Sequence, residues 1–147
     1  MIKLQEESVI LELKARNMEG ALMELAELLH RQCTHIDLAN LYSLLNEREQ
    51  VGSTGVGNGV AIPHAKVKKL ERILVCLGRS HEGIHFDSID NQPVHLIVLI
   101  LSPADRPEDY LKTLAKISRF LKQPEMRRQL RQATTAANLV EFFNNSV

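Results

Sequence analysis

The stretch PVHLIVLILSP, residues 93–103, contains the longest apolar run of the chain, at residues 96–101. A strand with this run would present apolar side chains on both of its faces, because successive side chains alternate across a sheet. Such a strand is typical of the centre of a sheet that helices cover on both sides. The run is far shorter than the roughly 18 residues that indicate a membrane span. We therefore expect a central, buried strand.

The sequence around this strand alternates between strand and helix patterns. Further strands are expected at residues 8–15, 59–65 and 72–80. Helices are expected at residues 18–32, 34–49, 107–122, 125–132 and 136–143. Asn17 is placed to cap the first helix, and Thr34 with Asp37 to form a capping box for the second. This order predicts an α/β fold with helices packed on a mixed sheet, as one domain over residues 1–147.

Composition limits the classes of partner. The chain has 147 residues, 44% of them hydrophobic, which is enough for one core. Its 18 basic and 18 acidic residues cancel, so we expect no binding of nucleic acid by overall charge, and any anion site must be local. Cys33 and Cys76 lack C-x-x-C spacing, and we expect buried, reduced thiols. Without a signal peptide pattern or a membrane span, we expect a cytoplasmic protein with no membrane insertion.

A second unusual stretch is VGSTGVGNGVAIPHAK, residues 51–66, in which four glycines fall within eight residues. Backbone N–H groups in glycine-rich loops can converge on phosphate oxygens. The stretch does not match the P-loop, because Val60 and Ala61 stand where Lys and Ser or Thr are required. It does not match the dinucleotide-binding motif, because GVGNG is one residue short and leads into a strand pattern and not a helix. We predict a phosphate nest at Gly52, Gly55, Gly57 and Gly59. The predicted phosphate-binding residues are Ser53, Thr54, Gly55, Gly57, Asn58 and Gly59.

His64 follows this loop directly. Strand alternation places His64 on the same side as Val60 and Ile62, and Pro63 confines the segment to a sheet edge or a strand end. A histidine beside an anion site can carry a phosphoryl group on one ring nitrogen, while the other nitrogen needs a proton and an acceptor. Arg48, near the end of the preceding helix, could fork onto two phosphate oxygens.

The residues alone leave a plainer interpretation of these groups open. His64 could be a surface histidine beside a tight turn, and Arg48 a solvated charge at a helix end. Ser53 and Thr54 could be turn residues that bond to their own backbone.

Three other histidines, His81, His85 and His95, lie within 15 residues of one another. His81 and His85 would share a face only on a helix, and the segment between them contains Gly83 and is typical of a turn between strands. We therefore expect no metal site.

The segments GSTGVGNGVAIPHAK and FDSIDNQPVHLIVLILSPAD resemble the type-2 enzyme IIA domain, the fructose and mannitol class, of the bacterial phosphoenolpyruvate-dependent phosphotransferase system. The resemblance is strongest to the nitrogen-regulatory branch. It implies a mixed sheet of about five strands flanked by helices on both faces. It also implies that His64 accepts a phosphoryl group on Nε2 from a histidine phosphocarrier protein, with Arg48 beside it. It implies no metal and no organic cofactor.

One position departs from the family pattern. In EDYLKTL, Tyr110 stands where the family usually carries a second active-site histidine. A tyrosine hydroxyl can donate one hydrogen bond, but it does not become a cation near pH 7. We therefore expect slower phosphoryl transfer than with histidine at this position.

Two roles follow from the resemblance. Because no permease or sugar-binding domain is fused to the chain, we expect regulation rather than sugar uptake, with regulatory target proteins or a separate enzyme IIB as acceptor. The alternative is a regulatory binding module that keeps the fold but has lost phosphoryl transfer, with Tyr110 as its mark.

Overall fold

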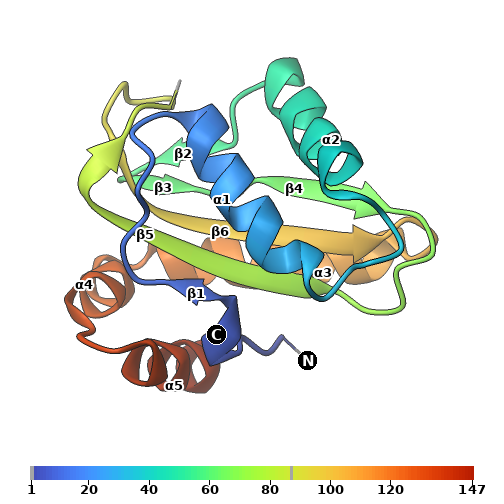
Figure 1. The fold of residues 1–147 in the computed structure, drawn as a ribbon. Helices are drawn as coiled ribbons and strands as arrows, with labels where there is room; N and C mark the ends of the chain where they lie inside the picture. Colours follow the sequence, from blue (N-terminus) through green and yellow to red (C-terminus); the bar gives the residue numbers. More distant parts are fainter. Residues whose placement is uncertain (1, 87) are drawn as a thin grey trace.

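The computed structural model describes residues 2–86 and 88–147, which build one mixed sheet of six strands with helices on both faces (Figure 1). The strand order is β1-β5-β6-β3-β2, and β4 also pairs with β6. The strands are β1 (Val9–Ile10), β2 (Gly55–Gly57), β3 (Val60–Ala61), β4 (His64–Val67), β5 (Leu74–Ile84) and β6 (Val94–Pro103). The predicted α/β class and the helices on both faces are confirmed.

Strand β6 lies at the centre, as its apolar run predicts. It pairs with β5 in antiparallel fashion and with β3 and β4 in parallel fashion. Its side chains alternate between two cores: Ile97, Leu99 and Leu101 enter one, whereas Leu96, Val98 and Ile100 enter the other. The central strand is therefore buried on both faces.

Helices α1 (Met18–His30) and α2 (Leu38–Val51) cover the face of the sheet that is nearer the viewer in Figure 1. Helices α3 (Pro107–Lys122), α4 (Pro124–Gln132) and α5 (Ala136–Ser146) supply the core on the opposite face. The apolar stripe of α1 places Leu22, Leu25 and Leu29 in the first core, and α3 places Ile117 and Phe120 in the second.

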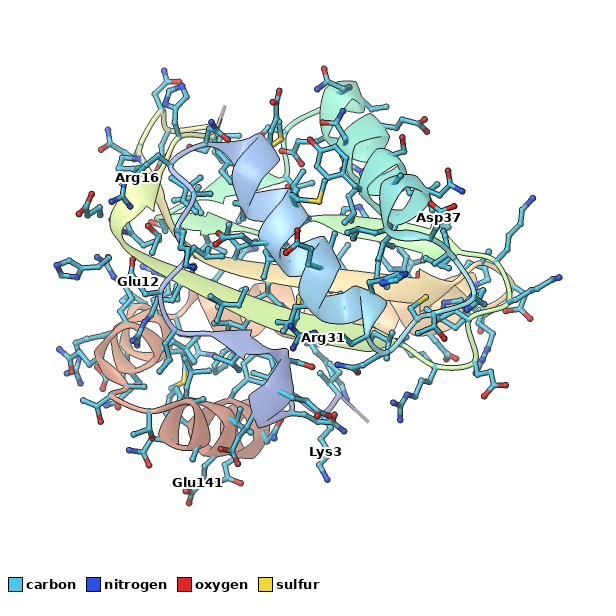
Figure 2. All side chains as sticks on the ribbon, viewed as in Figure 1. Lys3, Glu12, Arg16, Arg31, Asp37 and Glu141 are labelled. Carbon is cyan, nitrogen blue, oxygen red and sulfur yellow. The ribbon has the colours of Figure 1, made fainter. Side chains whose placement is uncertain are left out.

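The first predicted cap is confirmed and the second is corrected. Asn17 Oδ1 accepts a hydrogen bond from the Gly20 N–H at 2.8 Å and caps α1. The capping box of Thr34 and Asp37 is not formed, because Asp37 itself is the N-cap of α2 (Figure 2). Its Oδ1 accepts from the Asn40 N–H at 2.8 Å. The short acidic side chain in an extended conformation bonds an otherwise free N–H of the first turn, so the helix begins after it.

The strand predicted at residues 8–15 is much shorter in the structure. Ser8 belongs to a short 3₁₀ helix, η1 (Glu6–Ser8), and only Val9–Ile10 pairs with β5. The N–H groups of Lys14 and Ala15 donate to the Glu24 carboxylate on α1 instead of to a neighbouring strand. A side chain from a helix thus replaces the sheet partner that the alternating pattern suggests.

Both cysteines, Cys33 and Cys76, are free and buried, as expected, and burial raises the pKa of each thiol. Across the described residues, no helix has both the length and the apolar character that crossing a membrane requires.

Candidate functional site

The site lies at the edge of the sheet that strands β3 and β4 form beside β6. Strands β3 and β4 run end to end along β6, with Ala61 opposite Ile97 and His64 opposite Ile100. Pro63 interrupts them and contributes only its carbonyl, which accepts from the Ile100 N–H at 3.0 Å. His64 is therefore the first residue of a strand at the sheet edge, which confirms the prediction from Pro63.

Two contacts fix the protonation pattern of the His64 ring. Its Nε2 lies 3.1 Å from Arg48 Nε, and its Nδ1 lies 2.9 Å from the Ile62 carbonyl oxygen. A guanidinium N–H only donates and a carbonyl only accepts. The neutral ring that satisfies both partners therefore carries its proton on Nδ1 and its lone pair on Nε2.

The surroundings also favour the neutral form of this ring. Burial lowers the pKa of His64 below its ordinary value, and the positive charges of Arg48 and Lys66 lower it further. The hydrogen bond to Ile62 and the Glu49 carboxylate act in the opposite direction. Near pH 7 the ring is thus an uncharged imidazole, and its Nε2 lone pair accepts the Arg48 N–H.

Arg48 reaches His64 from the last turn of α2. Its Nη1 donates at 2.8 Å to the carbonyl of Gly52, the first residue after the helix. This second bond holds the guanidinium plane while Nε faces the imidazole. The structure therefore brings together the two residues that the sequence places sixteen positions apart.

Glu49 is a residue of the site that the sequence does not single out. It is 8% exposed, and its carboxylate accepts from the Thr54 backbone N–H at 2.9 Å and from the Thr54 hydroxyl at 2.7 Å. In the sequence, Glu49 within NEREQ is indistinguishable from a solvated residue at a helix end. In the fold, it ties the glycine-rich segment to α2.

The glycine-rich segment itself forms a β-hairpin. Asn58 and Gly59, with φ of 58° and 75°, make the turn between β2 and β3. Asn-Gly is a preferred pair for such a two-residue turn, and this signal was available in the sequence. The glycines thus serve the backbone conformation of a tight hairpin.

Several backbone donors of the predicted phosphate nest are already engaged. The Gly55 N–H donates to Ser53 Oγ, the Asn58 N–H to the Asp90 carboxylate, and the Thr54 N–H to Glu49. Gly57 and Gly59 lie at the far end of the hairpin, beside Ile89 and His95 respectively. The N–H groups of Thr54, Gly55 and Asn58 are therefore not free to form the predicted nest in this structure.

Tyr110 approaches His64 from α3, on the face of the sheet opposite to α2. It is the fourth residue of α3 and is 9% exposed, and its ring centroid lies 5.4 Å from that of His64. Burial raises the pKa of its phenol, with Arg48 acting in the opposite direction, so the side chain is neutral near pH 7. Lys66 Nζ lies 5.9 Å from the Tyr110 ring centroid, which places a second cation near the imidazole.

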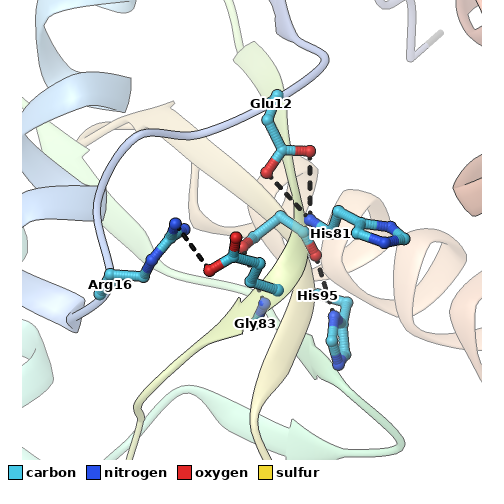
Figure 3. A network of polar contacts seen from close by, with 7 residues as sticks. Glu12, Arg16, His81, Gly83 and His95 are labelled. Atoms are coloured by element: carbon cyan, nitrogen blue, oxygen red, sulfur yellow. Dashed lines mark hydrogen bonds and ion pairs between the residues drawn. The ribbon is translucent and has the colours of Figure 1, made fainter.

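His81, His85 and His95 make hydrogen bonds within the fold. The His81 backbone N–H donates to the Glu12 carboxylate, and His95 Nδ1 lies 2.9 Å from the Ser80 carbonyl oxygen (Figure 3). His85 bonds through its backbone to Arg16. Within residues 2–86 and 88–147, no group of three side chains is arranged to hold a metal ion.

Comparisons with known proteins show that the chain belongs to one family. Residues 3–146 match the family "Phosphoenolpyruvate-dependent sugar phosphotransferase system, EIIA 2". The nitrogen regulatory protein of Bradyrhizobium diazoefficiens is 38% identical over 130 residues, which are 88% of this chain and 84% of that protein. The nitrogen regulatory protein of Pseudomonas aeruginosa is 32% identical over 121 residues, 82% of this chain and 79% of that protein.

Solved structures agree in fold. The nitrogen regulatory protein IIA-Ntr of Neisseria meningitidis superposes with a TM-score of 0.89 at 28% identity and covers 94% of both chains. The Escherichia coli enzyme IIA for mannitol, solved in complex with phosphorylated enzyme IIB, superposes with a TM-score of 0.80 at 18% identity over 99% of both chains.

Proposed function

We propose that this chain, which belongs to the EIIA 2 family of the phosphoenolpyruvate-dependent sugar phosphotransferase system, accepts a phosphoryl group on Nε2 of His64. The observation that carries this proposal is the pair of contacts to Arg48 and to the Ile62 carbonyl. Together they leave the lone pair on Nε2, the nitrogen that faces away from the strand's own backbone.

The donor is a histidine phosphocarrier protein. In the transfer step, the Arg48 Nε–H turns from Nε2 to an oxygen of the incoming phosphoryl group. The Nε2 lone pair then forms the new N–P bond while the N–P bond of the donor breaks, and the electron pair of that bond returns to the donor ring. No proton has to leave Nε2, because Nε2 carries none. The ring gains positive character, and the hydrogen bond from Nδ1 to the Ile62 carbonyl stabilises it.

Arg48 and Lys66 supply the positive charge that balances the phosphoryl oxygens. Arg48 Nε, which donates to Nε2 in the unmodified protein, is close enough to turn to an oxygen of a phosphoryl group bound there, and its Nη1 donates to the Gly52 carbonyl. The role of the hairpin is then to position this end of α2, through the bonds between Glu49 and Thr54. Tyr110 contributes a neutral ring edge to the site.

A phosphoryl donor must place its own phosphorylated histidine next to His64. Two apolar side chains flank the site and are exposed: Val51 at the end of α2, 86% exposed, and Leu111 next to Tyr110, 60% exposed. We infer that these two residues contact the partner protein. A separate enzyme IIB, as in the mannitol complex, or a regulatory target takes the same surface as acceptor, and the nitrogen regulatory relatives favour the regulatory role.

The test is phosphorylation in a reconstituted system. The chain is incubated with phosphoenolpyruvate, enzyme I and the phosphocarrier protein, and intact mass is measured before and after mild acid. We expect one acid-labile phosphoryl group on the wild type and on His81→Ala, an exposed histidine far from the site, and none on His64→Ala. If a competent carrier leaves the wild type unmodified, the proposal fails.

A second candidate rests on Tyr110, which places a neutral ring where an imidazolium would assist transfer. In that case the chain is a regulatory binding module without phosphoryl transfer. The same experiment separates the two functions, because the module binds its target while its mass stays unchanged.

A further inference from the structure

A groove lies on the other side of α3 from His64. Helix α3, the start of β5 and the N-terminal segment line it, and its volume is about 620 Å³. Sites for small molecules fall in the range of about 300–1,000 Å³. His64, Arg48 and Lys66 are not among its lining residues, so the groove is separate from the phosphorylation site.

The groove concentrates positive charge in a chain whose overall charge is zero. Lys112, Lys116 and Arg119 project from one face of α3, because they are spaced at i, i+4 and i+7. The cations that line the groove are Lys3, Arg72, Arg106, Lys112, Lys116 and Arg119, and among the described residues the single lining carboxylate is that of Asp109.

These charges are largely uncompensated. Arg106 lies 3.9 Å from the Asp105 carboxylate. The other five cations form no ion pair within 4 Å with any carboxylate that the structure describes. Like charges gathered in one concave surface repel one another, and an anion bound among them relieves that repulsion.

The floor of the groove differs from its rim. Val75, whose side chain lies in the core beneath α3, and Pro103 are buried apolar residues, and the nearly buried Thr113 adds a hydroxyl. A cationic rim over an apolar floor fits a ligand with several negative charges joined to a less polar part.

We propose that this groove binds a small molecule that carries two or more phosphate groups. Nucleoside polyphosphates and sugar bisphosphates share this chemistry, and the apolar floor favours a nucleotide. The proposal does not depend on phosphorylation of His64.

The test is titration calorimetry at low salt with adenosine triphosphate, fructose 1,6-bisphosphate and inorganic tripolyphosphate as probes. The double variant Lys112→Gln/Lys116→Gln is expected to bind the preferred probe at least about tenfold more weakly, as the loss of charged hydrogen bonds implies. Lys122→Gln is the matched control, because Lys122 is exposed on the same helix but does not line the groove. It should bind like the wild type, as should His64→Ala.

If adenosine triphosphate binds most tightly of the three probes, the apolar floor holds a nucleobase. If fructose 1,6-bisphosphate binds most tightly, the groove holds a sugar phosphate. The proposal is overturned if no probe binds at about 1 mM, a concentration that would detect even weak ligands. It is equally overturned if Lys122→Gln weakens binding as much as the double variant, or if His64→Ala abolishes binding. Tighter binding of a single-stranded oligonucleotide than of every small probe would assign the surface to nucleic acid instead.

Discussion

The His64 ring is held neutral by burial and by the two cations beside it, Arg48 and Lys66. We therefore predict that its pKa in the folded protein lies below the ordinary value of 6.5. Removing one of the two charges in Arg48→Gln should raise this pKa, as followed by the ring carbon and proton shifts in an NMR titration. Lys122→Gln, far from the ring, should leave it unchanged. An equal pKa in Arg48→Gln and in the wild type would contradict the electrostatic account.

The sign of the stability effect follows from the same shift. Between the lowered pKa of the folded state and about 6.5 in the unfolded chain, the unfolded state binds more protons. His64 therefore contributes stability that is present above about pH 6.5 and is lost as the pH falls through the folded pKa. In urea unfolding at a series of pH values, His64→Gln should remove this part of the pH dependence.

Tyr110 lies 5.4 Å from the His64 ring and is neutral, so it cannot balance charge on a phosphoryl group. We predict that Tyr110→His accelerates phosphoryl transfer by about tenfold, since one hydrogen bond to a charged group contributes a free energy that corresponds to about that factor. Initial rates of labelled phosphoryl incorporation from the phosphocarrier protein measure the effect. Tyr110→Phe is the control that keeps the ring without the hydroxyl. An equal or slower rate in Tyr110→His would count against this role.

At the scale of elements, the β2–β3 hairpin depends on one glycine for close packing. A Cβ at Gly55 would lie 2.7 Å from Ser88 Cβ and 3.0 Å from Ser88 Cα, both closer than side chains pack. We predict that Gly55→Ala lowers the free energy of unfolding by about 1–3 kcal/mol, the usual cost of overpacking.

Gly52 offers the matched control for this prediction. No heavy atom lies within 4 Å of a Cβ built there, and its φ of 175° is open to any residue. Gly52→Ala should change stability by less than about 0.5 kcal/mol in the same urea titration. Equal losses in the two variants would mean that glycine's flexibility, and not the contact with Ser88, decides the effect.

The helices and the central strand could be predicted from the sequence because their signals are local. The apolar stripe of α1 and the apolar run of β6 each depend on residues that are neighbours in the chain. The strand expected at residues 8–15 failed for the opposite reason, since Glu24 on α1 captures the N–H groups of Lys14 and Ala15. A partner ten residues away along the chain leaves no trace in an alternation pattern.

At the scale of the whole molecule, Arg79 joins segments from three parts of the chain. From β5, its guanidinium donates to the Leu11 carbonyl at 3.0 Å, to Leu130 at 2.9 Å and to Ala133 at 2.7 Å. The last two are carbonyls at the C-terminal end of α4, which otherwise lack helical partners. Arg79 thus fixes α4 against the sheet and the N-terminal segment.

We predict that Arg79→Met lowers the free energy of unfolding by about 2 kcal/mol, because several carbonyls lose a charged donor. Thermal or urea unfolding measures the change. Arg128→Met is the control, because Arg128 is an exposed arginine in the middle of α4 whose side-chain partners among the described residues are Glu125 and Gln132. Its loss should have little effect. A comparable loss of unfolding free energy in both variants would refute the role of Arg79 in fixing α4 against the sheet.

By itself, the sequence determined the α/β class, the buried strand at residues 93–103 and the placement of His64 at a strand end after Pro63. Each of these depends on the chemistry of residues adjacent in the chain. Only the tertiary structure decided that Arg48 and the Ile62 carbonyl hold the His64 ring between them, and that the glycines build a hairpin tied to Glu49. It also decided that six cations from separate segments meet in one groove. Those contacts arise because packing brings distant segments together, and local sequence patterns do not record which distant side chains will meet.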